Sequence, residues 1–289
     1  MSTLTSSNVP TFIISYNRVG YLRRVIARLE AMGFQNLIVI DNASTYEPLL
    51  QYLADSPHAV VRLDRNHGHL ALWRSGRFDQ IIQRERFILN DSDVMPAEDC
   101  PLDVTERLAE LLERYPRHTK AGLSLRIDDL PEHYAFKGQV LEWETPFWQN
   151  LLDDGNYEAA LDTTFALYRP GVHCDEERWW RSIRTAPPYT ALHLPWYQDT
   201  AVMTDEDRYY QEAVAGISSQ WSITDPALLK KQNTELQHEI ATLKRTISVL
   251  RGESAPPKGS PAWRNALRST LGATGMLTIV RRLRDNLKK

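Results

Sequence analysis

Two carboxylates stand two residues apart in the segment Asp91-Ser92-Asp93, directly after the apolar run 86–90. Like charges at this spacing repel each other unless a cation lies close to both. Mg²⁺ and Mn²⁺ prefer oxygen ligands and often join carboxylates to substrate phosphates. The segment therefore predicts a divalent-cation site that handles a phosphate-bearing substrate.

Alternating strand-like and helix-like segments surround this motif. Short apolar runs predict strands over 11–15, 36–41, 59–63, 86–90 and 121–127. Helical spacing of apolar residues predicts helices over 19–32, 70–82 and 103–115. Such units imply an α/β fold of the Rossmann-like kind, a mostly parallel twisted sheet flanked by helices. Ligands bind beyond the carboxyl ends of the strands in such sheets.

Polar residues follow four of these strands at that edge. They are Asn17 and Arg18, Asp41 and Asn42, Asn66 and His67, and Asp91 to Asp93. Four polar strand ends favour a nucleotide-binding crevice. The competing interpretation is that these are ordinary turn residues, because Asn and Asp favour turns for backbone reasons.

Four segments resemble, in family order, the donor-binding elements of GT-A glycosyltransferases of the family-2 kind. Residues 11–18 resemble the opening strand, and 39–45 the second strand with its nucleotide-contacting aspartate. Residues 65–69 resemble an Asn-x-Gly element, and 91–93 match the metal-binding D-x-D. The resemblance covers residues 11–93 and implies a GT-A fold for residues 1–225.

The resemblance also implies roles for individual residues. It assigns the donor nucleotide to Ser15, Tyr16, Asn17, Arg18, Asp41, Asn66, Asp91 and Ser92. In this scheme Asp41 contacts the base and Arg18 lies near a phosphate, although Arg18 also suits a solvated helix start. Asp93 coordinates Mn²⁺ or Mg²⁺, with Asp91 and a histidine from the later part of the domain as further ligands.

The histidine and the general base are open choices. His193 is the candidate metal ligand because it lies in an aromatic segment that could hold an imidazole rigidly, and the competitors are His67, His69 and His173. Asp162, at the entry to a strand predicted over 163–168, is the candidate base for an inverting transfer. The acidic runs 205–207 and 175–177 are alternatives, because the family's usual acidic pair is not clearly present.

The C-terminal part of the chain has a different pattern. Leu229, Leu236, Leu243 and Leu250 recur every seventh residue, with Asn233, Ile240 and Ile247 between them. This heptad predicts a parallel two-stranded coiled coil over 226–251 that makes the protein a homodimer. A surface helix packed on its own domain is the alternative.

A linker, 252–262, then leads to a basic amphipathic helical tail, 263–289. Residues 253–289 carry a net charge of +6 and leave −9 for residues 1–252. The tail suits an anionic membrane surface. Docking on the acidic domain of the same chain is the alternative.

Together these features predict a metal-dependent glycosyltransferase that moves a sugar from a UDP- or GDP-sugar to a glycan or lipid-linked acceptor in surface polysaccharide synthesis. A nucleotidyltransferase and a non-catalytic module that binds through its coil and tail are the alternatives. The sequence lacks the Gly-rich phosphate loop that a nucleotidyltransferase usually has, because residues 15–22 contain only one glycine, Gly20. The negative body argues against nucleic acid. Two cysteines and no signal-like N-terminus favour a cytoplasmic protein, peripheral on the inner face of the membrane.

Overall fold

The computed structural model describes residues 4–199 and 202–214. The predicted coiled coil over 226–251, the linker over 252–262 and the basic tail over 263–289 lie outside the described residues. None of the described helices is long and apolar enough to cross a bilayer.

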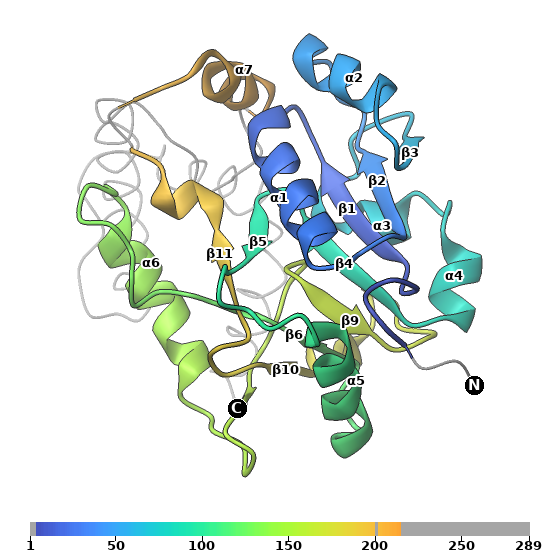
Figure 1. The fold of residues 1–289 in the computed structure, drawn as a ribbon, viewed down its shortest axis with the longest axis vertical. Helices are drawn as coiled ribbons and strands as arrows, with labels where there is room; N and C mark the ends of the chain where they lie inside the picture. Colours follow the sequence, from blue (N-terminus) through green and yellow to red (C-terminus); the bar gives the residue numbers. More distant parts are fainter. Residues whose placement is uncertain (1–3, 200–201, 215–289) are drawn as a thin grey trace, which may run out of the picture. The chain divides into compact units, whose positions relative to one another are not determined.

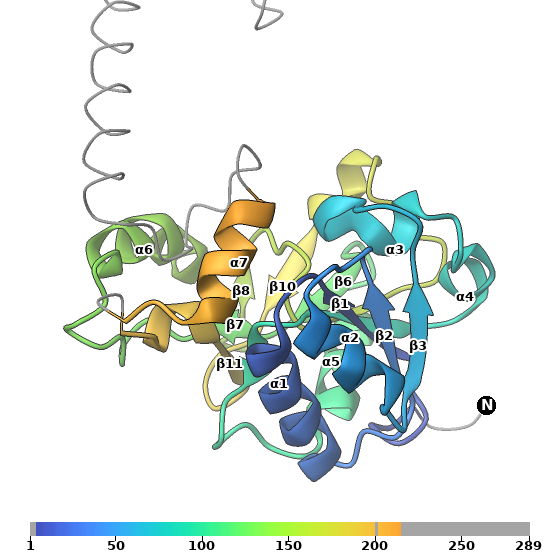
Figure 2. The same ribbon diagram turned by 90° about the horizontal axis from the view of Figure 1, so that it is seen from above.

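The N-terminal half forms strand–helix units around a sheet. Its elements are β1 (Thr11–Ser15), α1 (Val19–Ala31), β2 (Leu37–Asp41), α2 (Glu47–Ala54), β3 (Ala59–Arg62), η1 (Gly68–Leu70), α3 (Ala71–Arg74), α4 (Asp79–Arg84), β4 (Phe87–Asp91), β5 (Val94–Pro96) and α5 (Val104–Arg114). β1 and β4 are apolar on both faces because helices cover both sides of the sheet. Figures 1 and 2 show α1 and α2 on one face, with α3 and α4 on the other.

The second half adds shorter elements. They are β6 (Lys120–Gly122), β7 (Ser124–Leu125), α6 (Lys137–Glu144), η2 (Thr145–Trp148), β8 (Tyr157–Glu158), β9 (Ala166–Tyr168), η3 (Glu177–Trp180), β10 (Ser182–Arg184), β11 (Thr190–His193), η4 (Leu194–Tyr197) and α7 (Asp205–Ala213). The last helix, α7, begins with a capping box between Thr204 and Asp207.

Two sheets organise these elements. The larger sheet has the order β3-β2-β1-β4-β9-β6-β10-β8. β3, β2, β1 and β4 run parallel, as does the β6–β10 pair, whereas β9 is antiparallel to both neighbours and β8 to β10. The sheet is therefore mixed, with a parallel half that matches the predicted Rossmann-like arrangement. A smaller sheet has the order β5-β11-β7.

Two predicted elements are divided in the structure. The helix predicted over 70–82 is instead η1, α3 and α4, because Gly76 adopts a φ of 64° that ends α3 and turns the chain. The strand predicted over 121–127 becomes β6 and β7, which lie in different sheets.

Candidate functional site

A pocket of about 800 Å³ lies beyond the carboxyl ends of the parallel strands. This volume is in the range of small-molecule sites. Its walls come from the ends of β1, β2, β4 and β11, from the loop after β3, and from α3, the segment before β9, and α7. The lining residues are Ile14, Tyr16, Arg18, Asn42, Arg65, Asn66, His67, Gly68, His69, Arg74, Asp91, Ser92, Asp93, Asp162, Thr163, His193, Tyr210 and Val214.

Most residues selected from the sequence meet at this pocket. Tyr16, Arg18, Asn66, Asp91, Ser92, Asp93, Asp162 and His193 all line it. Ser15, Asn17 and Asp41 are buried and are not among the lining residues. The structure thus brings together predicted side chains from five separate parts of the chain.

Asn17 and Asp41 shape the pocket wall from behind. The Asn17 side-chain oxygen accepts hydrogen bonds from the backbone amides of Thr45 and Tyr46, at 2.7 and 3.0 Å. Asp41 accepts from the Ser44 amide at 2.9 Å, and Arg62 lies 3.6 Å from its other carboxylate oxygen. These bonds join the ends of β1 and β2. A contact between Asp41 and a nucleotide base remains a prediction.

The turn that carries the two aspartates is held by its neighbours. The side-chain amide of Asn90 donates to the backbone carbonyl of Val94 at 2.8 Å, which closes the turn between β4 and β5. The Ser92 amide donates to the Ile14 carbonyl at 3.0 Å, which ties the turn to β1. The positions of Asp91 and Asp93 are therefore set by backbone geometry.

Asp91 is a carboxylate in an unfavourable setting. Burial, together with the nearby carboxylates of Asp93 and Asp162, holds its pKa well above the usual range. The Thr163 hydroxyl, which donates to Asp91 at 2.8 Å, opposes this shift only in part. Three acidic side chains therefore line one pocket together with three arginines, Arg18, Arg65 and Arg74.

His193 meets Asp93 at the junction of the two sheets. Its Nε2 lies 3.7 Å from Oδ2 of Asp93, and its ring packs against Trp196 with 4.7 Å between ring centres. Burial lowers the pKa of His193, Asp93 opposes that shift, and Arg18 adds to it. A neutral imidazole is the form that ligates metals. Of the competing histidines, His67 and His69 line the pocket, whereas His173 contacts Gln83 elsewhere.

These residues fit a cation only if the substrate supplies part of its coordination. In the described part of the chain, no group of three or more His, Cys, Asp or Glu side chains is arranged to hold a metal ion by itself. Asp93 and His193 offer two ligands that face one another, and the half-buried Asp91, whose pKa is raised, lies close to Asp93. Mg²⁺-type sites commonly combine one or two protein carboxylates with substrate phosphates.

Among the carboxylates considered as a base, Asp162 is the one that lines the pocket. It is 55% exposed, and its Oδ1 lies 4.0 Å from Nε2 of His69. Glu206 accepts from the amides of Val19 and Gly20, and Asp207 pairs with Arg18.

The other acidic candidates have partners away from the pocket. Asp205 pairs with Arg208, and Glu176 pairs with Arg178. Neither acidic run supplies a pocket-lining carboxylate.

Several lining residues were not predicted from the sequence. Arg65, Arg74, Thr163 and Tyr210 reach the pocket from the loop after β3, α3, the segment before β9, and α7. The Asn42 amide organises the loop after β3, because it donates to Asn66 and to the Gly68 carbonyl and accepts from the His67 amide. Asn42 was visible as a strand-end residue, whereas Tyr210 comes from a distant helix with no local signal.

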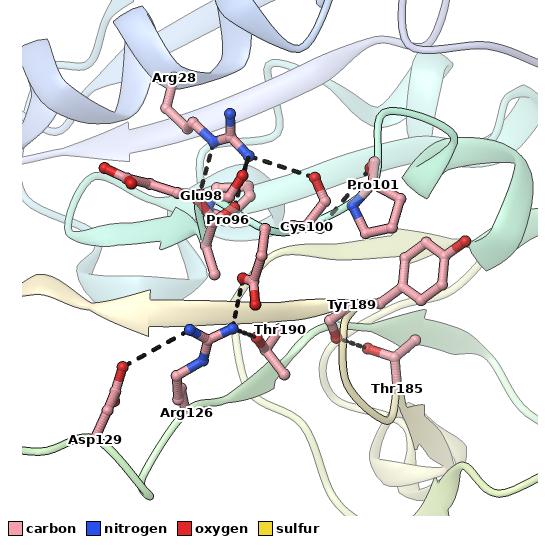
Figure 3. Close-up of polar contacts among 12 residues, drawn as sticks. Arg28, Pro96, Glu98, Cys100, Pro101, Arg126, Asp129, Thr185, Tyr189 and Thr190 are labelled. Atoms are coloured by element: carbon pink, nitrogen blue, oxygen red, sulfur yellow. Dashed lines mark hydrogen bonds and ion pairs between the residues drawn. The ribbon is translucent and has the colours of Figure 1, made fainter.

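Two arginines fix the chain that leaves β5 (Figure 3). Arg28 of α1 donates to the carbonyls of Pro96, Ala97, Glu98 and Cys100. Arg126, which follows β7, donates to Asp99 and to the Thr190 hydroxyl of β11. Together they secure the small sheet that carries His193.

Comparison with known proteins gives only a distant likeness. No protein-family model matches the sequence, and no curated protein matches it. One similar solved structure is the crystal structure of S. aureus TarS 1–349, with a TM-score of 0.37 and 12% sequence identity. The match covers 64% of this chain and 60% of that chain.

Proposed function

We propose that this chain is a glycosyltransferase that moves a sugar from a nucleoside-diphosphate sugar to a hydroxyl acceptor. The observation that supports it is the convergence of Asp91, Asp93, Asp162 and His193 on one pocket at the carboxyl ends of β1 and β4. A pocket with three carboxylates suits a substrate that arrives with a divalent cation, and its volume suits a nucleotide carrying a sugar.

The pocket residues have different proposed roles, which follow from their chemistry. Asp93 and His193 would hold Mn²⁺ or Mg²⁺, and the bound cation would neutralise the diphosphate as it leaves. Tyr16 and Asn66 are available to contact the nucleotide, whereas Arg18, which also lines the pocket, has its guanidinium paired with Asp207. The outer carboxylate, Asp162, is exposed at the pocket, whereas Asp91 is half-buried and accepts a hydrogen bond from Thr163.

The transfer itself needs one proton acceptor. In the proposed reaction, Asp162 removes the proton from the acceptor hydroxyl while the hydroxyl oxygen of the acceptor attacks the anomeric carbon of the donor sugar. The bond between that carbon and the diphosphate oxygen breaks, and the nucleoside diphosphate leaves with the bonding electron pair. Attack opposite the leaving group inverts the configuration at this carbon.

The proposal extends to the partners expected from the sequence. The acceptor is a glycan or lipid-linked sugar, the coiled coil over 226–251 joins two copies, and the basic tail over 263–289 meets an anionic membrane. Substituting Leu236 and Leu243 by glutamate tests the coil, because it should give monomers by light scattering. Sedimentation with anionic vesicles, with and without residues 253–289, tests the tail.

Calorimetric titration of UDP and GDP, each with and without Mn²⁺, tests the proposal directly. One nucleotide should bind, the metal should be needed, and Asp93→Ala should weaken binding at least about tenfold while the fold remains intact. Asp205→Ala is the matched control, because that carboxylate is exposed at the start of α7, pairs with Arg208 and does not line the pocket. Metal-independent binding that survives Asp93→Ala would contradict the proposed donor site.

A further inference from the structure

Lys120 is a fully buried lysine on β6 that the proposed reaction does not use. Its Nζ lies 3.2 Å from the centre of the Trp179 ring, 5.0 Å from that of Tyr168 and 5.9 Å from that of Trp180. Burial lowers the pKa of Lys120 to about 6; the Asp162 carboxylate opposes this shift, and the Arg184 charge adds to it. Buried lysines are rare, so a specific contact is expected to account for this one.

That contact leads toward the pocket. Nζ of Lys120 donates to the Tyr168 hydroxyl at 3.4 Å, and this hydroxyl donates to the backbone carbonyl of Asp162 at 3.3 Å. The Tyr168 ring is stacked on Phe87, with 5.1 Å between ring centres and 4° between planes. This stacking fixes the orientation of the Tyr168 ring. The Tyr168 hydroxyl is therefore held in place to hydrogen-bond the segment that carries Asp162.

Residues 161–165, here termed the floor segment, are held at other points too. The Thr163 hydroxyl donates to Asp91 at 2.8 Å, on the pocket side. On the opposite side the segment presses against β6, because a Cβ at Gly122 would lie 2.5 Å from Leu161 and from the Phe165 carbonyl oxygen. The Leu123 amide donates to that same carbonyl at 2.9 Å. The floor segment therefore joins the buried Lys120–Tyr168 pair to the pocket.

We propose that Lys120 and Tyr168 are positioning residues, which hold the floor segment so that the Asp162 carboxylate faces the pocket. The inference rests on the proposed role of Asp162. The Tyr168 hydroxyl gives its own proton to the Asp162 carbonyl, so a donor beside it completes its hydrogen bonding. Lys120 is that donor. An apolar residue on β6 would leave the hydroxyl with one bond fewer and the floor segment less firmly held.

Tyr168→Phe is the first test, because it deletes the hydroxyl and leaves the stacked ring. Tyr134→Phe is its matched control: Tyr134 is also buried, and its hydroxyl has no hydrogen-bond partner in the described part of the chain. The readout without ligand is hydrogen exchange of the Leu123 amide, followed by NMR. We expect exchange to be about tenfold faster in Tyr168→Phe and unchanged in Tyr134→Phe. Equal exchange rates in Tyr168→Phe and the unmodified protein would overturn the inference.

Kinetics then separate positioning from general stability. In Tyr168→Phe, kcat should fall by about tenfold or more while KM for the donor stays unchanged, because only the base is displaced. An unchanged kcat, or a rise in the donor KM alone, would also overturn the proposed positioning role of Lys120 and Tyr168. Failure of the proposed function gives a different result: the unmodified protein would bind no nucleotide, while the exchange experiment would still report on the floor segment.

Discussion

Nε2 of His193 lies 3.7 Å from Oδ2 of Asp93, and the pairing of β11 with β5 produces this contact. In that register His193 is opposite Val94, and the Leu194 amide donates to the Asp93 carbonyl at 2.8 Å. The imidazole is therefore delivered by backbone pairing rather than by a flexible loop. Preorganised ligands of this kind favour one cation geometry.

If His193 is the proposed metal ligand, His193→Gln should weaken the proposed metal-dependent nucleotide binding by at least about tenfold, because it removes the imidazole while keeping a side chain of similar length. Calorimetric titration with Mn²⁺ measures the effect. His58→Gln is the control, since His58 contacts Glu30 outside the pocket. Equal affinities in His193→Gln and the unmodified protein would exclude His193 as a ligand.

Lys120→Met should stabilise the fold at neutral pH even though it impairs positioning. The pKa of Lys120 falls from 10.5 to about 6 on folding. Between these values the unfolded chain holds one proton more than the folded chain, so the free energy of unfolding rises with pH. The shifted pKa of Lys120 therefore lowers the free energy of unfolding most below about pH 6, and it no longer lowers it above about pH 10.5.

Urea unfolding at several pH values tests this sign. Lys120→Met should unfold with a free energy at least about 1 kcal/mol higher at pH 7, and the difference should shrink toward pH 10. Lys137→Met is the control, because Lys137 pairs with Glu132 at the surface. A variant less stable than the unmodified protein at pH 7 would show that the buried amine contributes stability.

The sequence predicted the parallel half of the sheet well. β1, β2 and β4 are continuous apolar runs that end in polar residues, and this pattern is local. The division of the helix predicted over 70–82 was missed for a local reason as well. Gly76 stands within a run of otherwise helical spacing, and only its positive φ shows that the helix ends there.

The pocket was predicted in part for a related reason. Asp91 and Asp93 follow a strand directly, so chain order alone places them at the sheet edge. Tyr210 and Thr163 reach the same pocket through the packing of α7 and of the floor segment, which no nearby residue pattern indicates. The sequence also could not show that Asn17 and Asp41 are engaged with the backbone behind the pocket wall.

Arg28→Lys should lower the free energy of unfolding by about 1–3 kcal/mol. Arg28 reaches four carbonyls of the chain leaving β5, as Figure 3 shows, and a single ammonium group cannot reproduce this fork of donors. Urea unfolding measures the change. Arg24→Lys, on the exposed side of α1, is the control and should have no effect. Equal unfolding midpoints for both variants would show that the carbonyls find other donors.

Asp207→Asn should be the most destabilising of these changes, by about 3–5 kcal/mol, because it leaves the buried Arg18 charge unpaired. The two side chains meet at 2.8 Å and are 5% and 4% exposed. Burial alone would raise the pKa of Asp207, but hydrogen bonds from Thr204 and Gln198 and the charge of Arg18 hold the pKa below its usual value. Its stabilising contribution is thus complete above the unfolded pKa, about 3.9, and is lost as pH falls through the folded pKa.

Urea unfolding from pH 7 down to about pH 2 tests the pair, because the folded pKa of Asp207 lies below its unfolded value of about 3.9. The unmodified protein should lose its advantage over Asp207→Asn as the pH falls, whereas Asp205→Asn, at an exposed site on the same helix, should match the unmodified protein throughout. Combining Arg18→Met with Asp207→Leu should recover part of the stability, because no charge is then left unpaired. A double variant as unstable as Asp207→Asn would mean that Arg18 stabilises the fold by stacking on Tyr21 and Tyr210, and Asp207 by its capping box with Thr204, rather than through their charges.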